Sequence, residues 1–370
     1  YSVDNRLFSQ PIVLVQYLTN LIIPNPSDFA LFHDDFPVSS GLLSPPKTLI
    51  SILIITCLLI TGFVYRNKFT LFSFAVFWFF AGHSLEASHV NLELYFEHRN
   101  YLPSIATSAV IASLAIYCYR RFSRSASIIF MSGYLVLVTL ITYGEVMVWA
   151  NPVRQAVEWA RSHPGSVRAL DTLAGAHLYV REYENASITY ERILEVNERD
   201  FYPYLKGVTI AYCYKQNQLT DNEWSNIFEK AKNARRYGSA VYAEIDTLVT
   251  KIEKGACGSM PIPNLMRMLL ALIFNPEFES SRAPFHYFNA VLAIRLGDAH
   301  SALNNINESV RLEEVSTNLI LKLKILSALD MNSEIDKTFN KLNDYLDAHP
   351  REKLAKITVV NELEKKLFNE

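Results

Sequence analysis

The sequence predicts an all-α protein in which a four-span membrane domain is followed by a tetratricopeptide-like α-solenoid. Half of the residues are hydrophobic and 19% are charged, and most of the apolar excess lies before residue 150. Runs such as TLISILIITCLLITGFVY and SIIFMSGYLVLVTLITYG in that part contain no charged residue. After residue 150 the charge density is ordinary and apolar residues recur at helical spacing in paired segments. We therefore divide the chain into residues 1–47, 48–150 and 151–370.

The first division is expected to hold an interfacial helix and an external loop. Ser9 followed by Pro11 is typical of a helix start, and Pro24 is expected to end the helix. A broad apolar stripe lies between them, formed by Ile12, Val15, Leu18 and Ile22. At about 14 residues this helix is too short to cross a bilayer, which indicates an interfacial or re-entrant segment.

The loop that follows, PNPSDFALFHDDFPVSSGLLSPPK, is rich in Pro, Ser and Asp and has no period. His33, Asp34 and Asp35 stand out in it. These side chains could serve a metal or act as a general base, or they could cap turns and carry solvated charge. The sequence leaves both interpretations open.

Four spans are expected in residues 48–150. They are 48–65, 69 to about 85, 101–119 and 126 to about 144. The first and last connections are short and basic, with Arg66 and Lys68 in one and Arg120, Arg121 and Arg124 in the other. The positive-inside rule places both turns in the cytoplasm. The N-terminal loop, the middle loop 83–104 and everything after Ala150 then share the opposite side.

Loop 83–104, HSLEASHVNLELYFEHRNYLPS, is unusually polar and aromatic for its position between apolar segments. Ionisable groups near a membrane are costly unless they are paired or functional. Any site chemistry is therefore expected here.

Helical hairpins follow from Asn151 onward. In residues 166–197, small residues at Ala174 and Ala186 allow two helices to approach closely, in the 34-residue tetratricopeptide layout. Residues 285–314 repeat this layout with Ala290, Gly297 and Ala302, and 323–350 repeat it more loosely. Residues 152–164 form a half-repeat, 200–281 fit less well, and 351–368 are expected to form a capping helix.

Charge and cysteine content set further bounds. The net charge of −2 predicts no nucleic-acid partner, because a phosphate-binding surface needs a concentrated basic face. No CxxC motif or Cys/His spacing indicates a metal, and no metal is expected. Cys57 and Cys118 lie in apolar runs, whereas Cys213 and Cys257 could pair in an oxidising compartment, which sequence alone leaves open.

Several of these segments together carry a resemblance. RLFSQPIVLVQYL, the LFHDDFPVS loop, the LYFEHRNYLPS loop and the spans that lead into the repeats resemble the C-terminal half of GT-C type membrane glycosyltransferases. These are polyprenyl-phosphate-sugar-dependent enzymes, similar to the transmembrane and tetratricopeptide-repeat O-mannosyltransferases and their bacterial relatives. The resemblance covers most of residues 5–200. EHRNYLPS is fairly specific, whereas the repeats occur in many unrelated scaffolds.

The resemblance implies a polyprenyl-phosphate-linked sugar as donor substrate, with no covalently bound cofactor. It also implies a catalytic acid in an N-terminal multi-span half that this sequence does not contain, so the chain is expected to be a fragment and its catalytic residues stay unknown. Topology fits a bacterial inner membrane with the repeats in the periplasm. An endoplasmic reticulum membrane with the repeats in the lumen is the alternative.

A lipid phosphate at the membrane face needs a cation, and Arg99 is the only Lys or Arg in loop 83–104. We expect Arg99, with His98 and Tyr101, to contact that phosphate. Glu93 and Glu97 would orient Arg99 or activate an acceptor, supported by His33, Asp34 and Asp35. The equally weighted alternative is that Arg99 is tied to Glu97 or Glu93 in a structural network.

Two functions are compatible with these sequence features. In the first, the chain is the membrane and acceptor-binding part of a glycosyltransferase that acts outside the cytoplasm, with a protein or glycan acceptor in the groove of the repeats. In the second, it is a non-catalytic membrane-anchored scaffold whose repeats recruit protein partners in an envelope assembly. Membrane lipid is a partner in both.

Overall fold

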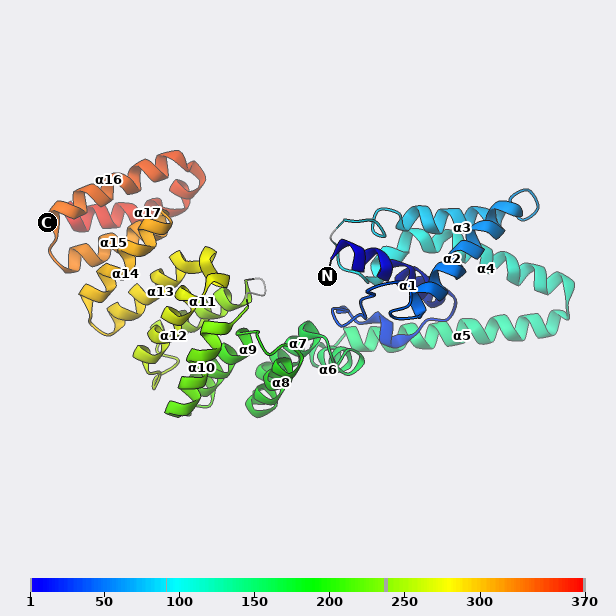
Figure 1. The fold of residues 1–370 in the computed structure, drawn as a ribbon, viewed down its shortest axis with the longest axis horizontal. Coiled ribbons are helices and arrows are strands. Elements are labelled where there is room, and N and C mark those ends of the chain that lie inside the picture. Colours follow the sequence, from blue (N-terminus) through cyan, green and yellow to red (C-terminus); the bar gives the residue numbers. More distant parts are fainter. Residues whose placement is uncertain (1, 91, 236–238, 369–370) are drawn as a thin grey trace. The chain divides into compact units, whose positions relative to one another are not determined.

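The computed structural model describes residues 2–90, 92–235 and 239–368. Within these ranges the chain is helical and contains no strand, only two isolated β-bridges, which confirms the all-α class. The chain divides into two compact units, Tyr1–Thr189 and Tyr190–Glu370, and the division falls inside one helix, α8 (Tyr183–Val196). Figure 1 gives the order of the helices.

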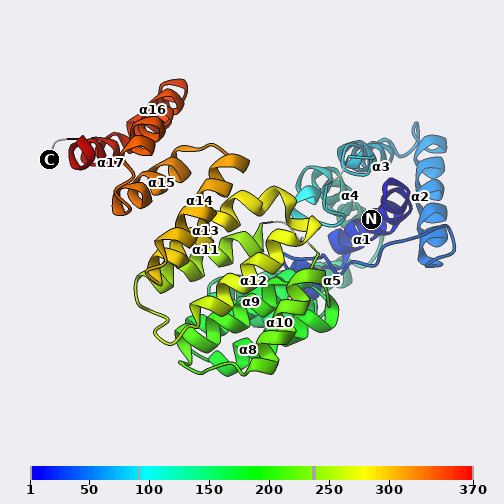
Figure 2. The ribbon, with the colours of Figure 1, turned by 60° about the vertical axis from the view of Figure 1, so that its left-hand side comes forward.

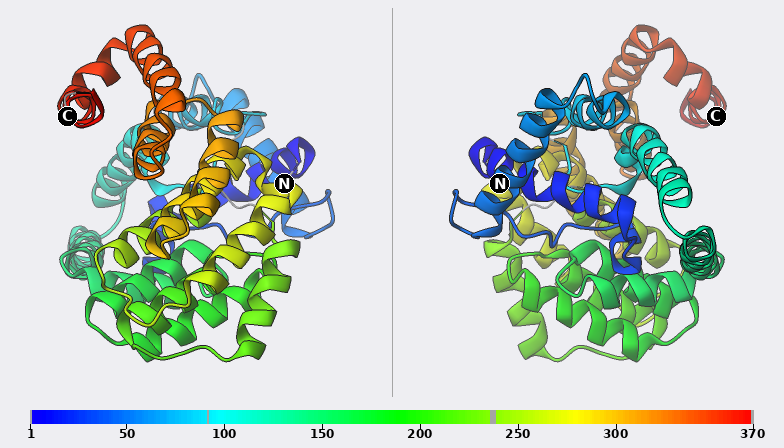
Figure 3. Two further views of the ribbon diagram at one scale, coloured as in Figure 1. Left: turned by 90° about the vertical axis from the view of Figure 1, so that its left-hand side faces the viewer. Right: turned by 90° about the vertical axis from the view of Figure 1, so that its right-hand side faces the viewer.

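The first unit begins with four helices and their connections. They are α1 (Val3–Ile22), α2 (Lys47–Val64), α3 (Thr70–His83) and α4 (Tyr101–Arg121). Three more follow before α8: α5 (Arg124–Trp149), α6 (Pro152–Ser162) and α7 (Val167–Tyr179). Figure 1 shows α4 and α5 joined by a short turn, and Figure 3 views α5 nearly along its axis.

Among the described residues, three helical segments are long and apolar enough to cross a membrane. They are Lys47–Val64, Glu97–Arg121 and Arg124–Trp149, with mean hydropathies of 2.2, 1.5 and 1.9. The segment expected as a further span contains α3, an apolar helix of 14 residues. At 1.5 Å per residue its length is about 21 Å, less than the hydrocarbon thickness of about 30 Å.

Helix α3 packs closely on α4 at Gly82. A Cβ atom at this position would lie 2.9 Å from Cγ of Pro103, so only glycine permits the approach. This contact joins the end of α3 to the start of α4, the two helix ends that flank loop 83–104.

Helix α1 begins earlier than the sequence pattern predicts. It starts at Val3, where the Ser2 hydroxyl accepts a hydrogen bond from the Asn5 amide at 3.2 Å, and it continues through Pro11. The prediction that the helix starts after Ser9 was therefore wrong. Pro11 removes one backbone donor, but packing of the 20-residue helix compensates, and Arg6 becomes part of its buried face.

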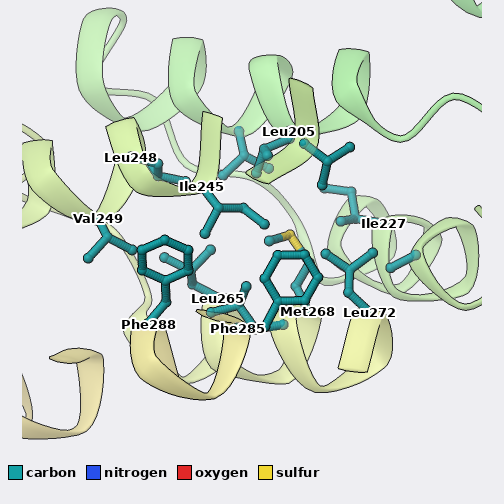
Figure 4. Packing of buried hydrophobic residues seen from close by; sticks show 14 of the residues in the cluster. Leu205, Ile227, Ile245, Leu248, Val249, Leu265, Met268, Leu272, Phe285 and Phe288 are labelled. Carbon is teal, nitrogen blue, oxygen red and sulfur yellow. The ribbon is translucent and has the colours of Figure 1, made fainter. Parts of the chain in front are cut away.

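The second unit consists of helices that follow one another along the chain. After the end of α8, its elements are α9 (Tyr202–Thr209), a π turn (Ile210–Tyr214), α10 (Asp221–Asn233), α11 (Ala240–Glu253), α12 (Ile262–Phe274), a 3-10 helix (Pro276–Ser281), α13 (Arg282–Arg295), α14 (Ala299–Leu312), α15 (Ser316–Ala328), α16 (Asn332–Ala348) and α17 (Pro350–Phe368). Consecutive helices of this unit, such as α13 and α14, lie side by side (Figure 2). A large apolar core joins α9 to α13, and Figure 4 shows Ile245, Met268 and Phe285 within it.

Two features of this unit bear on the sequence-based expectations. Cys213 and Cys257 form a disulfide between the π turn and the segment before α12, which answers the pairing question that the sequence left open. Helices α13 and α14 form a hairpin whose turn contains Gly297 at φ +75°, and Ala290 and Ala302 are fully buried between apolar neighbours.

Candidate functional site

Loop 83–104 is held in place by the buried guanidinium group of Arg6. This group donates hydrogen bonds to the carbonyl oxygens of Glu86 at 2.7 Å and Ser88 at 3.1 Å, and also to that of Leu92. Arg6 is only 1% exposed. Because guanidinium donors point in several directions from one plane, a single side chain of α1 can hold the loop at Glu86, Ser88 and Leu92.

Tyr17 of α1 anchors the second half of the loop. Its hydroxyl donates to the carbonyl oxygen of Phe96 at 2.9 Å and accepts from the Phe96 amide at 2.6 Å. Burial raises the pKa of Tyr17, so the phenol remains a neutral donor. Asn100 completes the anchor by donating to the Tyr17 carbonyl oxygen at 3.1 Å and accepting from Nε2 of His83 at 3.3 Å.

A cavity of about 510 Å³ opens beside this loop, and we call it the loop pocket. Its walls come from three segments that are distant in sequence: the chain after α1, the 3-10 turn Glu97–Asn100 with its neighbours, and the C-terminal part of α5. The lining residues are Pro24, Phe29, Leu31, Phe96, Glu97, His98, Tyr101, Val138, Ile141, Thr142, Glu145 and Trp149. Aromatic rings and ionisable groups thus share one cavity, a composition typical of ligand sites.

Glu145 and His98 are two ionisable residues whose side chains line the loop pocket. Neither side chain makes a hydrogen bond or ion pair with another part of the chain that the structure describes. Glu97, in contrast, is bound to His33. Glu145 was not expected from the sequence, although it is the only acidic residue in the 26 residues of α5. A lone carboxylate in a membrane-length helix is a functional signal in its own right.

A smaller cavity of about 280 Å³ adjoins the loop pocket. The two share Phe29, Glu97, His98 and Tyr101, and the smaller one extends to Tyr17 and Ser104. His98 and Tyr101, two of the residues expected to contact a phosphate, therefore lie where the cavities meet.

Arg99 lies elsewhere in the loop. Its guanidinium donates to the carbonyl oxygen of Glu93 at 2.5 Å, and Nε lies 3.8 Å from Oε1 of Glu86. Arg99 is not among the residues that line the loop pocket or the adjoining cavity. Burial raises the pKa of Glu86 and outweighs the opposing charge of Arg99. Within the described ranges, Arg99 therefore contacts the backbone of Glu93 and makes no polar contact with Glu97.

The Glu93 carboxylate and the His33–Asp35 cluster connect to α6 and α7. Arg168 of α7 binds the Glu93 carboxylate, and the Ser166 hydroxyl donates to Asp34. The amide of Arg168 also donates to Asp34, at 3.4 Å, so Asp34 helps to cap α7. Among the described residues no group of three or more His, Cys, Asp or Glu side chains is arranged to hold a metal ion.

His163, at the end of α6, meets Asp35 and His33. Its Nδ1 lies 2.8 Å from Oδ1 of Asp35, its Nε2 is 3.2 Å from the carbonyl oxygen of Ser27, and its ring contacts that of His33 edge-on at 4.4 Å. Burial lowers the pKa of His163, but the hydrogen bond and charge of Asp35, together with the Ser27 carbonyl and the charge of Asp28, raise the pKa overall. The N-terminal loop is thus bound to the first helical hairpin through paired ionisable groups.

The sequence matches no protein-family model and no curated protein.

Proposed function

We propose that the chain is the C-terminal membrane and acceptor-binding part of a GT-C type glycosyltransferase. It would move a sugar from a polyprenyl-phosphate donor to a protein or glycan outside the cytoplasm. The observation that carries the proposal is the loop pocket, because it combines uncommitted acid and imidazole groups with aromatic walls at the ends of membrane-length helices.

The pocket chemistry suits a sugar beside a lipid. Carboxylate oxygens of Glu97 and Glu145 accept hydrogen bonds from hydroxyl groups, and the faces of aromatic rings such as Trp149 offer apolar surface to a sugar ring. The same carboxylates repel a phosphate, so the phosphate would lie nearest to His98 and Tyr101. An imidazole in this place can also accept a proton from an acceptor hydroxyl.

The proposed topology has four spans, with α3 as the short one. Aromatic residues before and within it, Phe69 and Trp78 among them, fit a position near the interface, and a short apolar helix is accommodated by local thinning of the bilayer. The basic turns after α2 and α4 would face the cytoplasm. The disulfide between Cys213 and Cys257 supports an oxidising compartment for the second unit, either the bacterial periplasm or the endoplasmic reticulum lumen.

Helices α6–α17 would form the tetratricopeptide-like array that receives the acceptor. Buried alanines in the α13–α14 hairpin and a glycine-containing turn support this interpretation. An array of this kind presents an extended groove to a protein or glycan.

The test is binding of a polyprenyl-phosphate hexose to the chain in nanodiscs. Loss of one charge-assisted hydrogen bond in His98→Ala should weaken binding by roughly ten- to a hundredfold, with the melting temperature unchanged. His89→Ala is the matched control, because His89 is exposed in the same loop and does not line the pocket. Equal binding by wild type and His98→Ala would refute this role of His98.

The scaffold function is favoured by one observation, the engagement of Arg99 with Glu93 and Glu86. If loop 83–104 is only a structural plug, Arg99→Ala should lower the melting temperature without changing lipid binding. If Arg99 holds the phosphate, Arg99→Ala should weaken binding and Arg99→Lys should weaken it only in part. Both quantities should be measured on the same samples.

A further inference from the structure

The end of α6 is bound to the N-terminal loop by a histidine whose two ring nitrogens both face oxygen acceptors. Nδ1 of His163 lies 2.8 Å from Oδ1 of Asp35, and Nε2 lies 3.2 Å from the carbonyl oxygen of Ser27. A carboxylate and a carbonyl group only accept hydrogen bonds, and a neutral imidazole carries a single N–H group. Both contacts are therefore hydrogen bonds only while His163 is the doubly protonated imidazolium.

His33 connects this contact to the loop pocket. Its ring lies edge-on to the ring of His163, with the ring centres 4.4 Å apart, and it contacts the ring of Tyr95 at the same distance of 4.4 Å. Its Nε2 is bound to the Glu97 carboxylate, and its side chain is only 4% exposed. Glu97 lines both the loop pocket and the adjoining cavity. A short series of contacts thus leads from α6, through one buried imidazole, to an acid in the pocket wall.

The charged and titratable groups around these two histidines come from the N-terminal loop, loop 83–104 and α7. They are Asp28, Asp34, Asp35, Glu93, Glu97 and Arg168. Of the groups named, Asp35 contacts His163 through a hydrogen bond, and His33 contacts it through its ring. A change in the charge of His163 therefore acts first on Asp35 and on His33.

The N-terminal loop is packed tightly against the end of α6. A Cβ atom at Gly165, in the turn after α6, would lie 3.3 Å from Cβ of Asp35. Phe32, the neighbour of His33 in the chain, packs edge-on against Trp159 of α6, with the ring centres 5.3 Å apart. Closely packed groups transmit small displacements to one another. Loss of a hydrogen bond at the end of α6 would therefore shift the loop that carries His33.

We infer that His163 is a positioning residue for the loop pocket, because its imidazolium holds the N-terminal loop where His33 can fix the Glu97 carboxylate in the pocket wall. Loss of the proton removes one of the two hydrogen bonds of His163, so that His33 and Glu97 are held less firmly. A ligand that binds to Glu97 must then order this carboxylate itself, which weakens binding. Helix α6 thereby makes the loop pocket sensitive to pH. The inference rests on the proposed function only for the identity of the ligand as a glycosyl lipid.

The first test measures binding of a polyprenyl-phosphate hexose to the full chain in nanodiscs, about one pH unit below and above the usual histidine pKa of about 6.5. The phosphate of this lipid is a diester and does not titrate in this range. The wild type should bind roughly three- to tenfold more weakly at the higher pH. In His163→Gln this ratio should fall at least by about half, because an amide does not titrate and cannot donate to both acceptors. His98 is present in both proteins, so the difference between their pH profiles belongs to His163.

The matched control is His177→Gln. His177 lies on the neighbouring helix α7, where its Nδ1 is 2.8 Å from a carboxylate oxygen of Glu182, and it does not line the loop pocket. This variant also loses one imidazole beside one acid, and it should keep the pH profile of the wild type. Parallel pH profiles for the wild type and His163→Gln would overturn the inference.

A double-mutant cycle tests whether the effect passes through Glu97. At the lower pH, His163→Gln should weaken binding roughly three- to tenfold in the wild-type background and have no further effect in Glu97→Gln, because both changes act on the same carboxylate. Equal effects of His163→Gln in the two backgrounds would contradict the proposed role. Asp35→Asn, which keeps the size of the side chain but removes its charge, replaces His163→Gln should that variant fail to fold.

Amide hydrogen exchange of the ligand-free chain separates this inference from the proposed function. Residues 96–101 of the wild type should be better protected at the lower pH, beyond the intrinsic pH dependence of exchange, and His163→Gln should lose this excess protection. If the glycosyl lipid binds at neither pH, the proposed function fails and the exchange measurement alone decides the inference. Exchange that follows only its intrinsic pH dependence would overturn the positioning role of His163.

Discussion

Arg6 links the first helix to the loop on which the proposed site depends. Its guanidinium binds the carbonyl oxygens of Glu86, Ser88 and Leu92, and the side chain is buried. Removing it would leave buried carbonyl oxygens without donors, which costs more than the hydrogen bonds themselves contribute.

We therefore expect Arg6→Met to lower the free energy of unfolding by about 2 to 5 kcal/mol. Arg6→Lys should recover part of this loss, because a lysine keeps the charge but cannot reach all of the carbonyl oxygens at once. Thermal unfolding of the detergent-solubilised chain measures both. A change within error for Arg6→Met would mean that the loop does not depend on α1.

His163 predicts a pH dependence of the contact between α6 and the N-terminal loop. Its pKa is raised in the folded chain, against a usual value of about 6.5, so folding favours the protonated form. The stabilisation is complete below the unfolded pKa and is lost as pH rises through the higher folded pKa. Stability should therefore fall as the pH rises above the usual histidine pKa of about 6.5, and Asp35→Asn should flatten this slope. A slope of the opposite sign would contradict the assignment.

At the residue scale, the sequence indicated a loop that borders the loop pocket, but it did not indicate all of the residues that line this pocket. Loop 83–104 and His98, Glu97 and Tyr101 were expected, and they line the loop pocket. Arg99 was expected in the site because it is the only Lys or Arg in loop 83–104, but it does not line the loop pocket. The direction of its side chain depends on tertiary contacts that a sequence does not display. Glu145 could have been found, because it is an isolated acid in an apolar helix.

At the scale of elements, helix α7 tests the repeat pattern that the sequence predicts for residues 166–197. Ala174 of α7 is fully buried, whereas the next residue, Gly175, is exposed and a Cβ there would have no heavy atom within 4 Å. These two adjacent positions therefore face different surroundings on one helix.

Ala174→Leu should destabilise the chain by about 1 to 3 kcal/mol, because it overpacks a close contact. Gly175→Ala should instead stabilise it by up to about 1 kcal/mol, since alanine favours the helix and meets no neighbour. The melting temperatures of the two variants should move in opposite directions. Equal shifts would mean that the predicted register is wrong.

The helices themselves were predictable from hydrophobic period and capping residues, but their ends were less so. A proline at position 11 suggested a start, yet Ser2 caps the helix that runs through it. Propensity at a single residue is weak evidence where packing of a whole helix compensates for one lost hydrogen bond.

At the scale of the whole molecule, the proposed topology puts the two basic turns and the second unit on opposite sides of the membrane. After replacement of Cys57 and Cys118 by alanine, single cysteines near Lys68 and near Glu198 should react with an impermeant maleimide from opposite sides. Reaction of both positions from the same side would contradict the proposed external placement of the repeats.

The all-α class and the presence of apolar helices long enough to cross a membrane followed directly from composition and period. The disulfide and the loop pocket did not, because each depends on parts of the chain that are distant in sequence. Cys213 and Cys257 are 44 residues apart, and the pocket unites residues 24–31, 96–101 and 138–149. Proximity of this kind is a product of tertiary packing and leaves no local pattern.

The proposed function requires that the loop pocket hold the sugar of a lipid-linked donor. The most direct measurement compares binding of a polyprenyl-phosphate hexose and of the same polyprenyl phosphate without sugar, for wild type and Glu145→Gln in nanodiscs. We predict that the wild type prefers the sugar-bearing lipid by at least about tenfold and that Glu145→Gln loses most of this preference, because a carboxylate accepts hydroxyl hydrogen bonds more strongly than an amide does. Equal affinity of the wild type for the two lipids would contradict the proposal that the loop pocket holds the sugar.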